Sequence, residues 1–569
     1  MTDPTTSPVE RAGPDETALR VVRMARPRWG DPATPAQLPP AAAALIGTGD
    51  PGARRGVNID EIGLADPHVP PAVRAALIDA LGAEHVTADR YERIAHTRGY
   101  STPDLLALRN GDASDAPDLV VRPGSHDEVV AVLGICAAHR VAVVPFTGGT
   151  SVVGGLAPER AGFAGVVTVD VTRLDALVGV DEISRTATLQ AGLRGVRAEE
   201  LLRERGFILG HFPQSYEGAG LGGYAATRSA GQSSAGYGRF DEMVEGLLLA
   251  TPRGTIRLGT APKSAAGPDL RQLVLGSEGA FGIITEVTVR IRPVPAHRVF
   301  EGWRFADFGS GAAALRALAQ DGPMPTVLRL SDEVETAIGL TDPASAGGDE
   351  VTGGCLAIVG YEGHHQEVEA RRAAASAVLE DAGGVALGPG PGEAWRTGRF
   401  RAPYLRDPLL DAGVLVETLE TVTYWSRLAA LKTVVTAAIT DALNAQGTPP
   451  LVMCHISHVY AAGASLYFTV VCPQTDDPLA QWAAAKKASN DAIRAADAAI
   501  THHHGVGRDH RDAYHAEIGD LALEALRAVK RTLDPDGVCN PGVLLGSTRC
   551  SPPVHPVSTR SDVARPAGG

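Results

Sequence analysis

The stretch PFTGGTSVVGG, residues 145–155, decides the fold of this chain. Its glycines, Gly148, Gly149, Gly154 and Gly155, leave the backbone free to turn tightly and to present several N–H groups to an anion. No lysine follows them, so the stretch is not a Walker loop, and it does not open a helix as a dinucleotide-binding fingerprint would. On its own, the stretch indicates either an anion-binding loop or a glycine-rich connection between strands.

The residues before this stretch predict a strand, a helix and a second strand. DLVVRP, from Asp118, and VAVVPF, from Val141, are short apolar runs of the kind that form buried strands. Between them, SHDEVVAVLGICAAHR opens with Ser125 and Glu128 in capping-box spacing and continues with apolar residues at helical period. The glycine-rich stretch therefore follows the second strand of a βαβ unit.

Two further glycine-rich turns occur among predicted strands. EGAGLGG, residues 217–223, matches G-x-G-x-x-G, but Pro213 interrupts the residues before it and glycines and serines follow it, so we reject a Rossmann fingerprint. LGSEGAFGIITEVTVRIRP, residues 275–293, joins a turn to a strand that places Val287 and Ile291 on one face. Three backbone loops that converge on one long ligand would explain all three turns, which predicts an α+β domain with a large anionic cofactor.

Composition narrows the class of protein. A chain of 569 residues predicts about two or three structural domains. The net charge of -14 argues against broad nucleic-acid binding. The six cysteines form no C-x-x-C pair, so we expect free thiols and a reducing compartment. No apolar run approaches the roughly 20 residues of a membrane span and the N-terminus lacks the pattern of a signal peptide, so we expect a cytoplasmic protein.

Longer stretches carry a resemblance to a known family. PFTGGTSVVGG, PQSYEGAGLGGYAATRSAG and LGSEGAFGIITEVTVRIRP, in this order and spacing, resemble the FAD-binding domain of the vanillyl-alcohol oxidase and p-cresol methylhydroxylase superfamily. Within it, YLRD at Tyr404, CHISHVYAAGASLYFTV at Cys454, HHHGVGR at His502 and DPDGVCNPGVLL at Asp534 resemble the alkyldihydroxyacetonephosphate synthase family. The resemblance runs from about residue 26 to residue 545.

The resemblance implies an α+β fold in which a two-subdomain FAD-binding domain meets an α/β cap domain. The expected segments are a disordered tail at 1–25, a helical region at 26–115, the FAD-binding domain at 116–296, the cap at 297–500, a C-terminal segment returning to the flavin at 501–547, and a disordered tail at 548–569. Both tails are rich in Pro, Ser, Thr and Gly and have few large apolar side chains, so they cannot offset the entropy of ordering.

The resemblance also implies which residues contact FAD. Some relatives carry a histidine that binds the flavin covalently directly after the paired glycines, but Thr150 stands there, so we expect non-covalent FAD. The expected contacts are Pro145, Phe146, Thr147, Gly148, Gly149, Thr150 and Ser151; Gln214, Ser215, Tyr216, Glu217, Gly218, Ala219 and Gly220; Thr227, Arg228, Ser229 and Ala230; and Glu278, Gly279, Ala280, Phe281, Gly282, Ile283 and Ile284.

The activity implied is exchange of the acyl group of acyl-dihydroxyacetone phosphate for a long-chain alcohol through a flavin N5 adduct. Tyr460 matches the catalytic acid/base by this resemblance, with His502, His503 and His504 as catalytic support that lowers its pKa. The remaining expected contacts are with substrate: Arg406 with its phosphate and His455 beside it. From the residues alone, an Arg406–Asp407 surface ion pair and a core tyrosine at 460 remain alternatives.

A metal site is not expected. His455 and His458 have H-x-x-H spacing, but Tyr467 and His503 stand where the metal-dependent 2-hydroxyacid dehydrogenases of the superfamily carry further ligands. The alternative activity is that of an FAD-dependent oxidase or dehydrogenase acting on an alcohol or a 2-hydroxy acid, and a non-catalytic flavin-binding protein is a third hypothesis. The expected partners are a small phosphate- or carboxylate-bearing substrate of lipidic character, a second copy of the chain, and a peripheral membrane surface.

Overall fold

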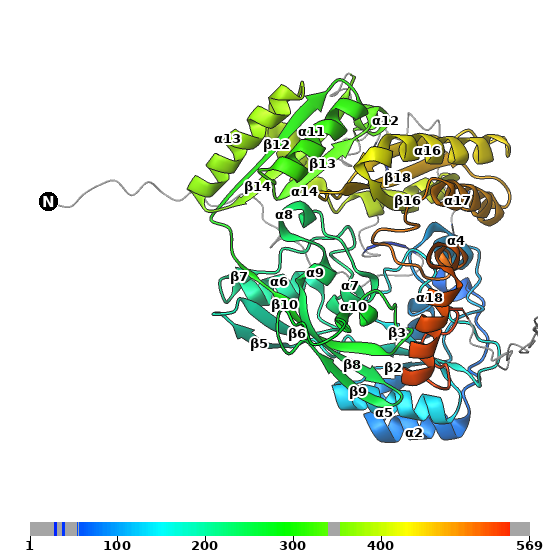
Figure 1. Ribbon diagram of the computed structural model, residues 1–569. Coiled ribbons are helices and arrows are strands. Elements are labelled where there is room, and N and C mark those ends of the chain that lie inside the picture. The colour runs from blue at the N-terminus through cyan, green and yellow to red at the C-terminus, as the bar shows by residue number, and fades with distance from the viewer. Residues whose placement is uncertain (1–27, 31–36, 40–53, 55, 340–352, 547–569) are drawn as a thin grey trace, which may run out of the picture.

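The computed structural model describes residues 28–30, 37–39, 54, 56–339 and 353–546. Both predicted tails, Cys550 and part of the predicted N-terminal region lie outside them. Figure 1 shows one body of sheets and helices below and a second, with its own sheet, above, and helix α18 lies beside both. Among the described residues no helix combines the length and apolar composition that a membrane span requires.

The first sheet of the lower body contains the predicted βαβ unit. Its strand order is β1 (Val86–Thr87), β2 (Leu119–Val121), β4 (Val166–Asp170) and β3 (Ala142–Phe146). Helix α5 (His126–Ala138) joins β2 to β3, and Ser125 Oγ accepts a hydrogen bond from Glu128 N at 3.1 Å, as the capping prediction requires. The unit is confirmed with one addition: β2 and β3 do not pair with each other, because both run parallel to β4 between them.

The second sheet is antiparallel and carries the third glycine-rich turn. Its order is β5 (Leu177–Asp181), β6 (Thr186–Gln190), β10 (Ile283–Arg290), β8 (Val244–Thr251) and β9 (Gly254–Leu258). Val287 and Val289 of β10 are fully buried, which confirms the predicted alternation. EGAGLGG leads into α7 (Leu221–Thr227), and β7 (Phe207–Ile208), the strand before it, pairs only with β11 (Arg292–Pro293) among the described strands, so this is not a Rossmann unit.

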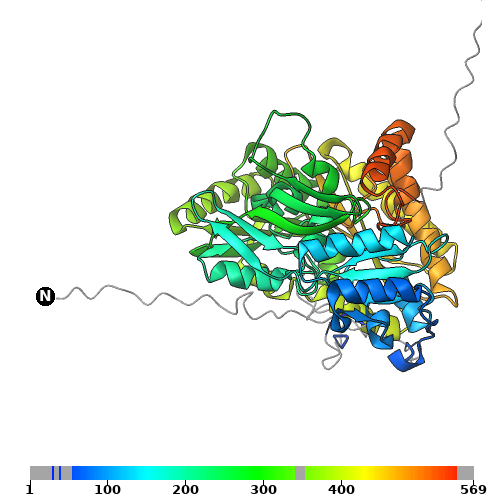
Figure 2. The same ribbon diagram turned by 90° about the horizontal axis from the view of Figure 1, so that it is seen from below.

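Helices surround the lower body. In Figure 2 the helices α2 and α5 lie side by side over the parallel sheet, and both contribute leucines and valines to its core. The helices of this body are α2 (Pro71–Leu81), α3 (Arg90–Ala95), α4 (Thr102–Arg109), α6 (Gly195–Arg203), α8 (Ser234–Tyr237), α9 (Phe240–Met243) and α10 (Arg271–Val274).

The upper body is a seven-stranded antiparallel sheet. Its order is β15 (Val385–Gly388), β12 (His297–Phe305), β14 (Cys355–Gly363), β13 (Val327–Ser331), β17 (Leu451–Ile456), β18 (Gly463–Pro473) and β16 (Val414–Tyr424). Its helices are α11 (Phe308–Asp321), α12 (Glu333–Ile338), α13 (His365–Asp381), α14 (Pro389–Gly398), α15 (Arg406–Asp411), α16 (Leu428–Asn444) and α17 (Pro478–Ala495). In Figure 1, α11, α13, α16 and α17 cover the upper side of this sheet.

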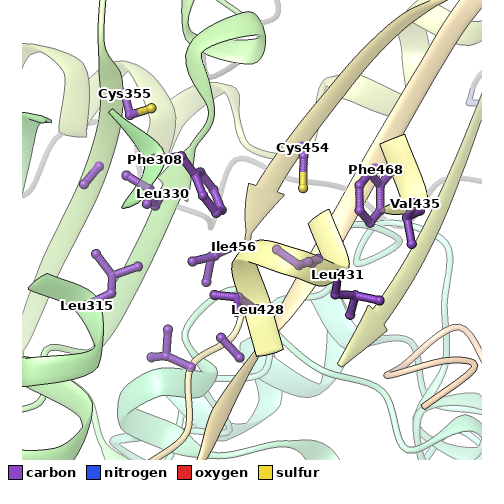
Figure 3. Close-up of a cluster of buried hydrophobic side chains, with 14 of the residues drawn as sticks. Phe308, Leu315, Leu330, Cys355, Leu428, Leu431, Val435, Cys454, Ile456 and Phe468 are labelled. Atoms are coloured by element: carbon purple, nitrogen blue, oxygen red, sulfur yellow. The ribbon is translucent and has the colours of Figure 1, made fainter. Parts of the chain in front are cut away.

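The hydrophobic core of the upper body covers one face of strands β16, β17 and β18, and their other face is available for a site. Figure 3 shows Leu428 and Leu431 of α16 beside Cys454, Ile456 and Phe468 of strands β17 and β18. Each such side chain contributes about 1.5–3 kcal/mol on burial. Because side chains alternate across a strand, the intervening residues of β17 and β18 point to the opposite face, toward the lower body.

The C-terminal segment packs onto the lower body. Helix α18 (Arg511–Leu533) is followed by a loop in which Asp534 accepts hydrogen bonds from Val538 N and Cys539 N. Cys539 then forms an isolated parallel bridge with Val143 of β3. The five described cysteines are free and buried, as expected from their spacing.

Candidate active site

A cavity of about 420 Å³ lies between the two bodies. Its floor is made by the three glycine-rich loops, and its roof by residues of β16, β17 and β18. The converging loops expected from the sequence therefore do meet, although more than a hundred residues separate the first from the third. They meet because the first follows β3, the second opens α7 and the third opens β10.

The first two loops pack backbone against backbone, which only glycine permits. A Cβ at Gly148 would lie 1.8 Å from the carbonyl oxygen of Gly218, and a Cβ at Gly220 would lie 2.3 Å from the side chain of Thr147. Gly149 has φ +66°, a conformation that other residues rarely adopt. This close, side-chain-free surface fits the pyrophosphate and ring edge of a dinucleotide such as FAD.

The third loop is tied to the C-terminal segment by a buried carboxylate. Glu278 lines the cavity and accepts hydrogen bonds from Val506 N at 2.9 Å and Gly507 N at 3.0 Å. Burial raises the pKa of Glu278 to about 7, against these two amide donors, which lower it. Asn540 Nδ2 donates to the carbonyl oxygen of Glu278 at 2.7 Å. The segment after the histidine run therefore closes one wall of the cavity.

The cavity includes most of the residues expected to contact the cofactor. All of 145–151 line it, as do Gln214, Ser215, Ala219, Gly220, Thr227, Ser229, Ala230, Glu278, Gly279, Gly282, Ile283 and Ile284. The expected residues outside the lining are Tyr216, Glu217, Gly218, Arg228, Ala280 and Phe281. Glu217 accepts a hydrogen bond from Tyr404, Arg228 donates to the carbonyl of Leu275, and Phe281 packs in a core with α18. These contacts turn the three side chains away from the cavity.

The roof is built by alternation along β18. Tyr467, Thr469 and Val471 line the cavity, whereas the intervening Phe468 and Val470 are buried in the core beneath α16. The ring of Tyr467 stacks on His455 at 4.9 Å between centroids. Burial raises the pKa of Tyr467 to about 12, while a hydrogen bond with Thr418 lowers it.

Tyr460, the tyrosine expected to be catalytic, is not part of the cavity lining, and neither is His502. The hydroxyl group of Tyr460 lies 2.6 Å from His502 Nε2, behind the roof. His503 and His504 do line the cavity, and their ring centroids lie 6.2 Å and 5.5 Å from that of Tyr467. In this geometry the tyrosine that reaches the cavity beside the histidines is Tyr467, because 460 belongs to the turn before β18.

A buried carboxylate that the sequence interpretation missed holds the histidine run. Glu420 of β16 accepts hydrogen bonds from His502 N at 2.5 Å, His503 N at 3.1 Å and His504 N at 2.9 Å, and from the Thr501 hydroxyl at 2.6 Å. Burial opposes ionisation, but the neighbouring imidazoles and this Thr501 hydroxyl hold the pKa of Glu420 well below its ordinary value. A carboxylate with four donors fixes the loop that carries the imidazoles.

His502 is buried, and His503 and His504 are half-buried at the cavity wall. Burial lowers the pKa of His504 to about 3 and lowers that of His503 in the same direction, although Glu420 favours their charged forms. A neutral imidazole has one donor and one acceptor nitrogen and can therefore accept a proton. Against burial, which raises the pKa of Tyr467, the positive charge of Arg406 also lowers it.

Three arginines line the cavity. Arg406 Nε is buried and has no hydrogen-bond partner within the part of the chain that the structure describes. The alternative of an Arg406–Asp407 ion pair is not observed, because Asp407 accepts from Trp29 N at 2.7 Å and lies 3.6 Å from Arg109. Arg399, which the sequence interpretation did not select, lies over the rings of Phe212, Trp395 and Phe400 at 4.9 to 5.4 Å.

The third arginine, Arg329, belongs to a separate ion-pair cluster at the cavity wall. It pairs with Glu335, which also lies 2.8 Å from His455 Nδ1. Burial opposes ionisation of Glu335, but His455 and Arg329 bring its pKa down to about 2. His455 therefore lines the cavity as expected but is committed to a carboxylate rather than free to bind a metal ion.

An apolar wall lies beside these polar groups. Its side chains come from α15 and its preceding turn and from three strands of the upper sheet: Leu405, Leu409, Val416, Met453 and Val471. None of them was selected from the sequence. The signal that existed was the alternation in SLYFTVV, where residues 467, 469 and 471 share one face.

The two bodies match two known family models. Residues 117–259 match the FAD binding domain, and residues 294–544 match the C-terminal domain of FAD linked oxidases. The solved structure of p-cresol methylhydroxylase, 14% identical, covers 85% of this chain with a TM-score of 0.65, which shows a shared fold. FAD is therefore the cofactor of this chain, as expected from the loops.

More similar relatives cover both bodies together. Alkyldihydroxyacetonephosphate synthase of Dictyostelium discoideum is 33% identical over 479 residues, 80% of this chain and 78% of the relative. That of Trypanosoma brucei brucei is 30% identical over 520 residues, 87% of this chain and 84% of the relative. A solved alkyldihydroxyacetonephosphate synthase structure, 27% identical, covers 93% of this chain and 99% of its own with a TM-score of 0.76. The chain therefore belongs to the alkyldihydroxyacetonephosphate synthase family of FAD-linked enzymes.

Proposed function

We propose that this enzyme exchanges the acyl group of acyl-dihydroxyacetone phosphate for a long-chain alcohol. The observation that carries the proposal is the composition of one cavity, in which glycine-rich loops, a tyrosine with two imidazoles and an aliphatic wall meet a guanidinium nitrogen that has no partner among the described residues. The loops correspond to FAD, and the other three parts correspond to the reacting carbon, the phosphate and the aliphatic chain of such a substrate.

The glycine-rich floor is the part that holds FAD. Residues 145–151 and the loop at 214–220 would receive it, and when bound it supplies an isoalloxazine ring that can exchange an electron pair with the reacting carbon. Non-covalent attachment is part of the proposal, supported by Thr150 at the position next to the paired glycines.

Tyr467 is the residue we assign to proton transfer at the reacting carbon, in place of Tyr460. Two tyrosines, Tyr224 and Tyr467, line the cavity, and Tyr467 is the one that lies beside the histidine run. Its high pKa keeps the hydroxyl protonated until a neighbour accepts the proton. His503 and His504 line the same wall, with ring centroids 6.2 Å and 5.5 Å from that of Tyr467, and are the ionisable groups placed to exchange a proton with it. Glu420 keeps their backbone in place from behind.

Arg406 is assigned to the substrate phosphate. A planar guanidinium can bind two phosphate oxygens at once, and Arg406 Nε, buried at the cavity without a partner among the described residues, is available for such a contact. Arg399, on its aromatic platform, adds positive charge to the same cavity. The aliphatic wall at Leu405, Leu409 and Val416 supports a lipidic substrate, because apolar contact is the interaction that alkyl chains offer.

The test is an anaerobic assay with the purified holoenzyme, acyl-dihydroxyacetone phosphate and hexadecanol. We expect release of fatty acid in equal amount to the ether product, with the flavin absorbance unchanged at the end. Absence of fatty acid in micelles, vesicles and detergent alike would contradict the proposal. Lasting bleaching of the flavin by an alcohol or 2-hydroxy acid would indicate the oxidase or dehydrogenase alternative, which the family membership does not favour.

The proposal extends to the setting of the enzyme. We include a homodimer and peripheral contact with a membrane that supplies the lipid, both supported by the family resemblance and the predicted lipidic substrate. We also include a cytoplasmic location, supported by the six cysteines without a C-x-x-C pair, which fit a reducing compartment. Sedimentation of the holoenzyme and its co-flotation with phospholipid vesicles measure the first two directly.

A further inference from the structure

Two side chains behind the cavity roof are connected to a residue inside it. Tyr460 Oη lies 2.6 Å from His502 Nε2, and His502 Nδ1 lies 2.9 Å from His503 Nδ1. Of these three, only His503 lines the cavity. The hydrogen bonds therefore cross the wall of the cavity, from one side to the other.

Tyr460, at the outer end of this series of hydrogen bonds, reaches the surface of the protein. Tyr460 is partly exposed, and the next two residues, Ala461 and Ala462, are exposed. The turn is fixed by Tyr460 N donating to the carbonyl of Gly463 at 2.8 Å and by Trp425 Nε1 donating to the carbonyl of Tyr460 at 3.0 Å. Burial raises the pKa of the Tyr460 hydroxyl, while the Arg239 guanidinium beside it lowers this pKa by its charge and a hydrogen bond. The phenol is thus held between the His502 imidazole and Arg239, in a residue that is partly exposed.

His502, in the middle of this series of hydrogen bonds, is suited to pass a proton. Both nitrogens of the buried His502 ring face a hydrogen-bonding partner, and burial lowers its pKa well below the ordinary value. A neutral imidazole that accepts a proton on one nitrogen can release the proton on the other. Its backbone N–H donates to Glu420, so the ring is anchored to the same carboxylate as His503.

We propose that His503, His502 and Tyr460 form a proton relay from the cavity to solvent. This rests on the proposed function, because exchange of an ester for an ether breaks the alcohol O–H bond and releases a fatty acid carboxylate and one proton. That proton binds His503 Nε2, the His503 Nδ1 proton moves to His502 Nδ1, the His502 Nε2 proton moves to Tyr460, and the Tyr460 hydroxyl proton passes to water. No electrons are transferred in these steps.

Binding of a metal ion is an alternative role for the same side chains. One ring nitrogen from each of His458, His502 and His503 lies within 4.8 Å of the others, close enough for three ligands. The observed contacts favour the relay, because the two Nδ1 atoms of His502 and His503 face each other at hydrogen-bond distance and His458 Nδ1 is used by Ser234 Oγ at 2.6 Å.

The kinetic test replaces the outermost group of the relay. Tyr460→Phe in the holoenzyme should lower kcat about tenfold, less than the roughly 10²–10⁴-fold effect of a direct acid or base, with KM and FAD content unchanged and a larger solvent deuterium isotope effect on kcat. Tyr460→Ala should be slower still and should be partly restored by added imidazole, which can enter the vacated space. Tyr424→Phe, at a tyrosine that is 63% exposed, is the matched control and should behave as wild type.

A second readout needs no turnover and so separates failure of the relay from failure of the proposed function. In ¹⁵N-histidine-labelled holoenzyme, Tyr460→Phe should shift the ring-nitrogen resonance that disappears in His502→Gln, and metal analysis should find less than 0.1 equivalent of zinc, copper or nickel. Unchanged kcat and isotope effect in Tyr460→Phe, an unmoved resonance, or about one equivalent of tightly held metal would each overturn the relay. Turnover absent in wild type with the resonance shift present would remove the proposed reaction and keep the hydrogen-bonded chain.

Discussion

The floor and the roof of the cavity are built by opposite means. The floor is backbone: loops at 145–151 and 214–220 approach so closely that a Cβ at Gly148 would lie 1.8 Å from a carbonyl oxygen. The roof is side chains: Tyr467, Thr469 and Val471 project from every second position of one strand. A large cofactor is held by backbone N–H groups, which can approach it closely where no side chain intervenes. Chemistry on a substrate requires side chains that are held in a fixed position.

The two constructions also differ in what they tolerate. A floor position such as Gly148 fails when a methyl group is added, because its neighbour, the Gly218 carbonyl, is backbone that cannot move aside. A roof position fails only when the group that does the chemistry is removed, since a ring of similar volume keeps the packing. Substitutions in the floor should therefore remove FAD, and substitutions in the roof should remove rate or substrate affinity while FAD stays.

The largest expected effect is in the floor. Gly148→Ala places a methyl group 1.8 Å from the Gly218 carbonyl oxygen and 2.5 Å from Arg194. We expect less than about a tenth of the FAD content of wild type after purification, because backbone overlap of this size forces the two loops apart. The measurement is the flavin-to-protein absorbance ratio.

The matched control is Gly134→Ala on the exposed side of α5, where a Cβ would meet nothing within 4 Å. Alanine is favoured over glycine inside a helix by about 1 kcal/mol, so this variant should keep its FAD and melt slightly higher. Full FAD in Gly148→Ala would mean that the loops do not depend on this contact.

The same difference decides what could be predicted from the sequence. Gly148, Gly149 and Gly220 are visible in the chain because a backbone that must turn or approach closely requires glycine. Tyr467 was visible only as one apolar-flanked tyrosine among others, and the interpretation favoured Tyr460, seven residues earlier, which the structure places behind the roof. The register of a strand relative to its core decides which face a tyrosine takes, and that depends on α16, more than 20 residues away in sequence.

The role of Glu420 shows that the sequence also does not reveal which charged side chains are buried. A glutamate in VETLETVTY can be a solvated side chain or a buried anchor, and sequence alone does not distinguish them. Its role depends on three backbone N–H groups that arrive from residues 502–504, which no local pattern in β16 specifies. The βαβ unit, by contrast, was predictable because its capping residues and apolar periods are all local.

The second prediction removes one atom from the roof. Tyr467→Phe keeps the ring that stacks on His455 and removes the hydroxyl we assign to proton transfer. We expect kcat for alkyl transfer to fall about a thousandfold, within the roughly 10²–10⁴-fold range for an acid/base group, with FAD content unchanged. Steady-state kinetics beside the flavin ratio measures both. A kcat within threefold of wild type would show that Tyr467 is packing rather than chemistry.

The third prediction concerns substrate affinity. Arg406→Met keeps an unbranched side chain and removes the guanidinium, so KM for acyl-dihydroxyacetone phosphate should rise about 30-fold, as expected for loss of roughly 2 kcal/mol of a charge-assisted contact. The KM for the alcohol should change little. Arg316→Met on the exposed side of α11 is the control and should leave both unchanged. Equal rises in both KM values would indicate a distorted cavity instead of a lost phosphate contact.

The smallest effect tests the neutral state of the roof histidines through stability. Burial gives His504 a pKa of about 3 in the folded protein, against about 6.5 when unfolded, so the unfolded chain binds more protons between these values. Its contribution to stability is complete above pH 6.5 and falls by about 1.4 kcal/mol for each pH unit below it. The thermal midpoint of wild type should therefore fall more steeply between pH 6.5 and 5 than that of His504→Gln, with His139→Gln, exposed at the end of α5, following the wild-type curve. Parallel curves for wild type and His504→Gln would mean that folding does not lower the pKa of this imidazole. A steeper fall in His504→Gln than in wild type would mean that the imidazole is charged in the folded protein beside Tyr467.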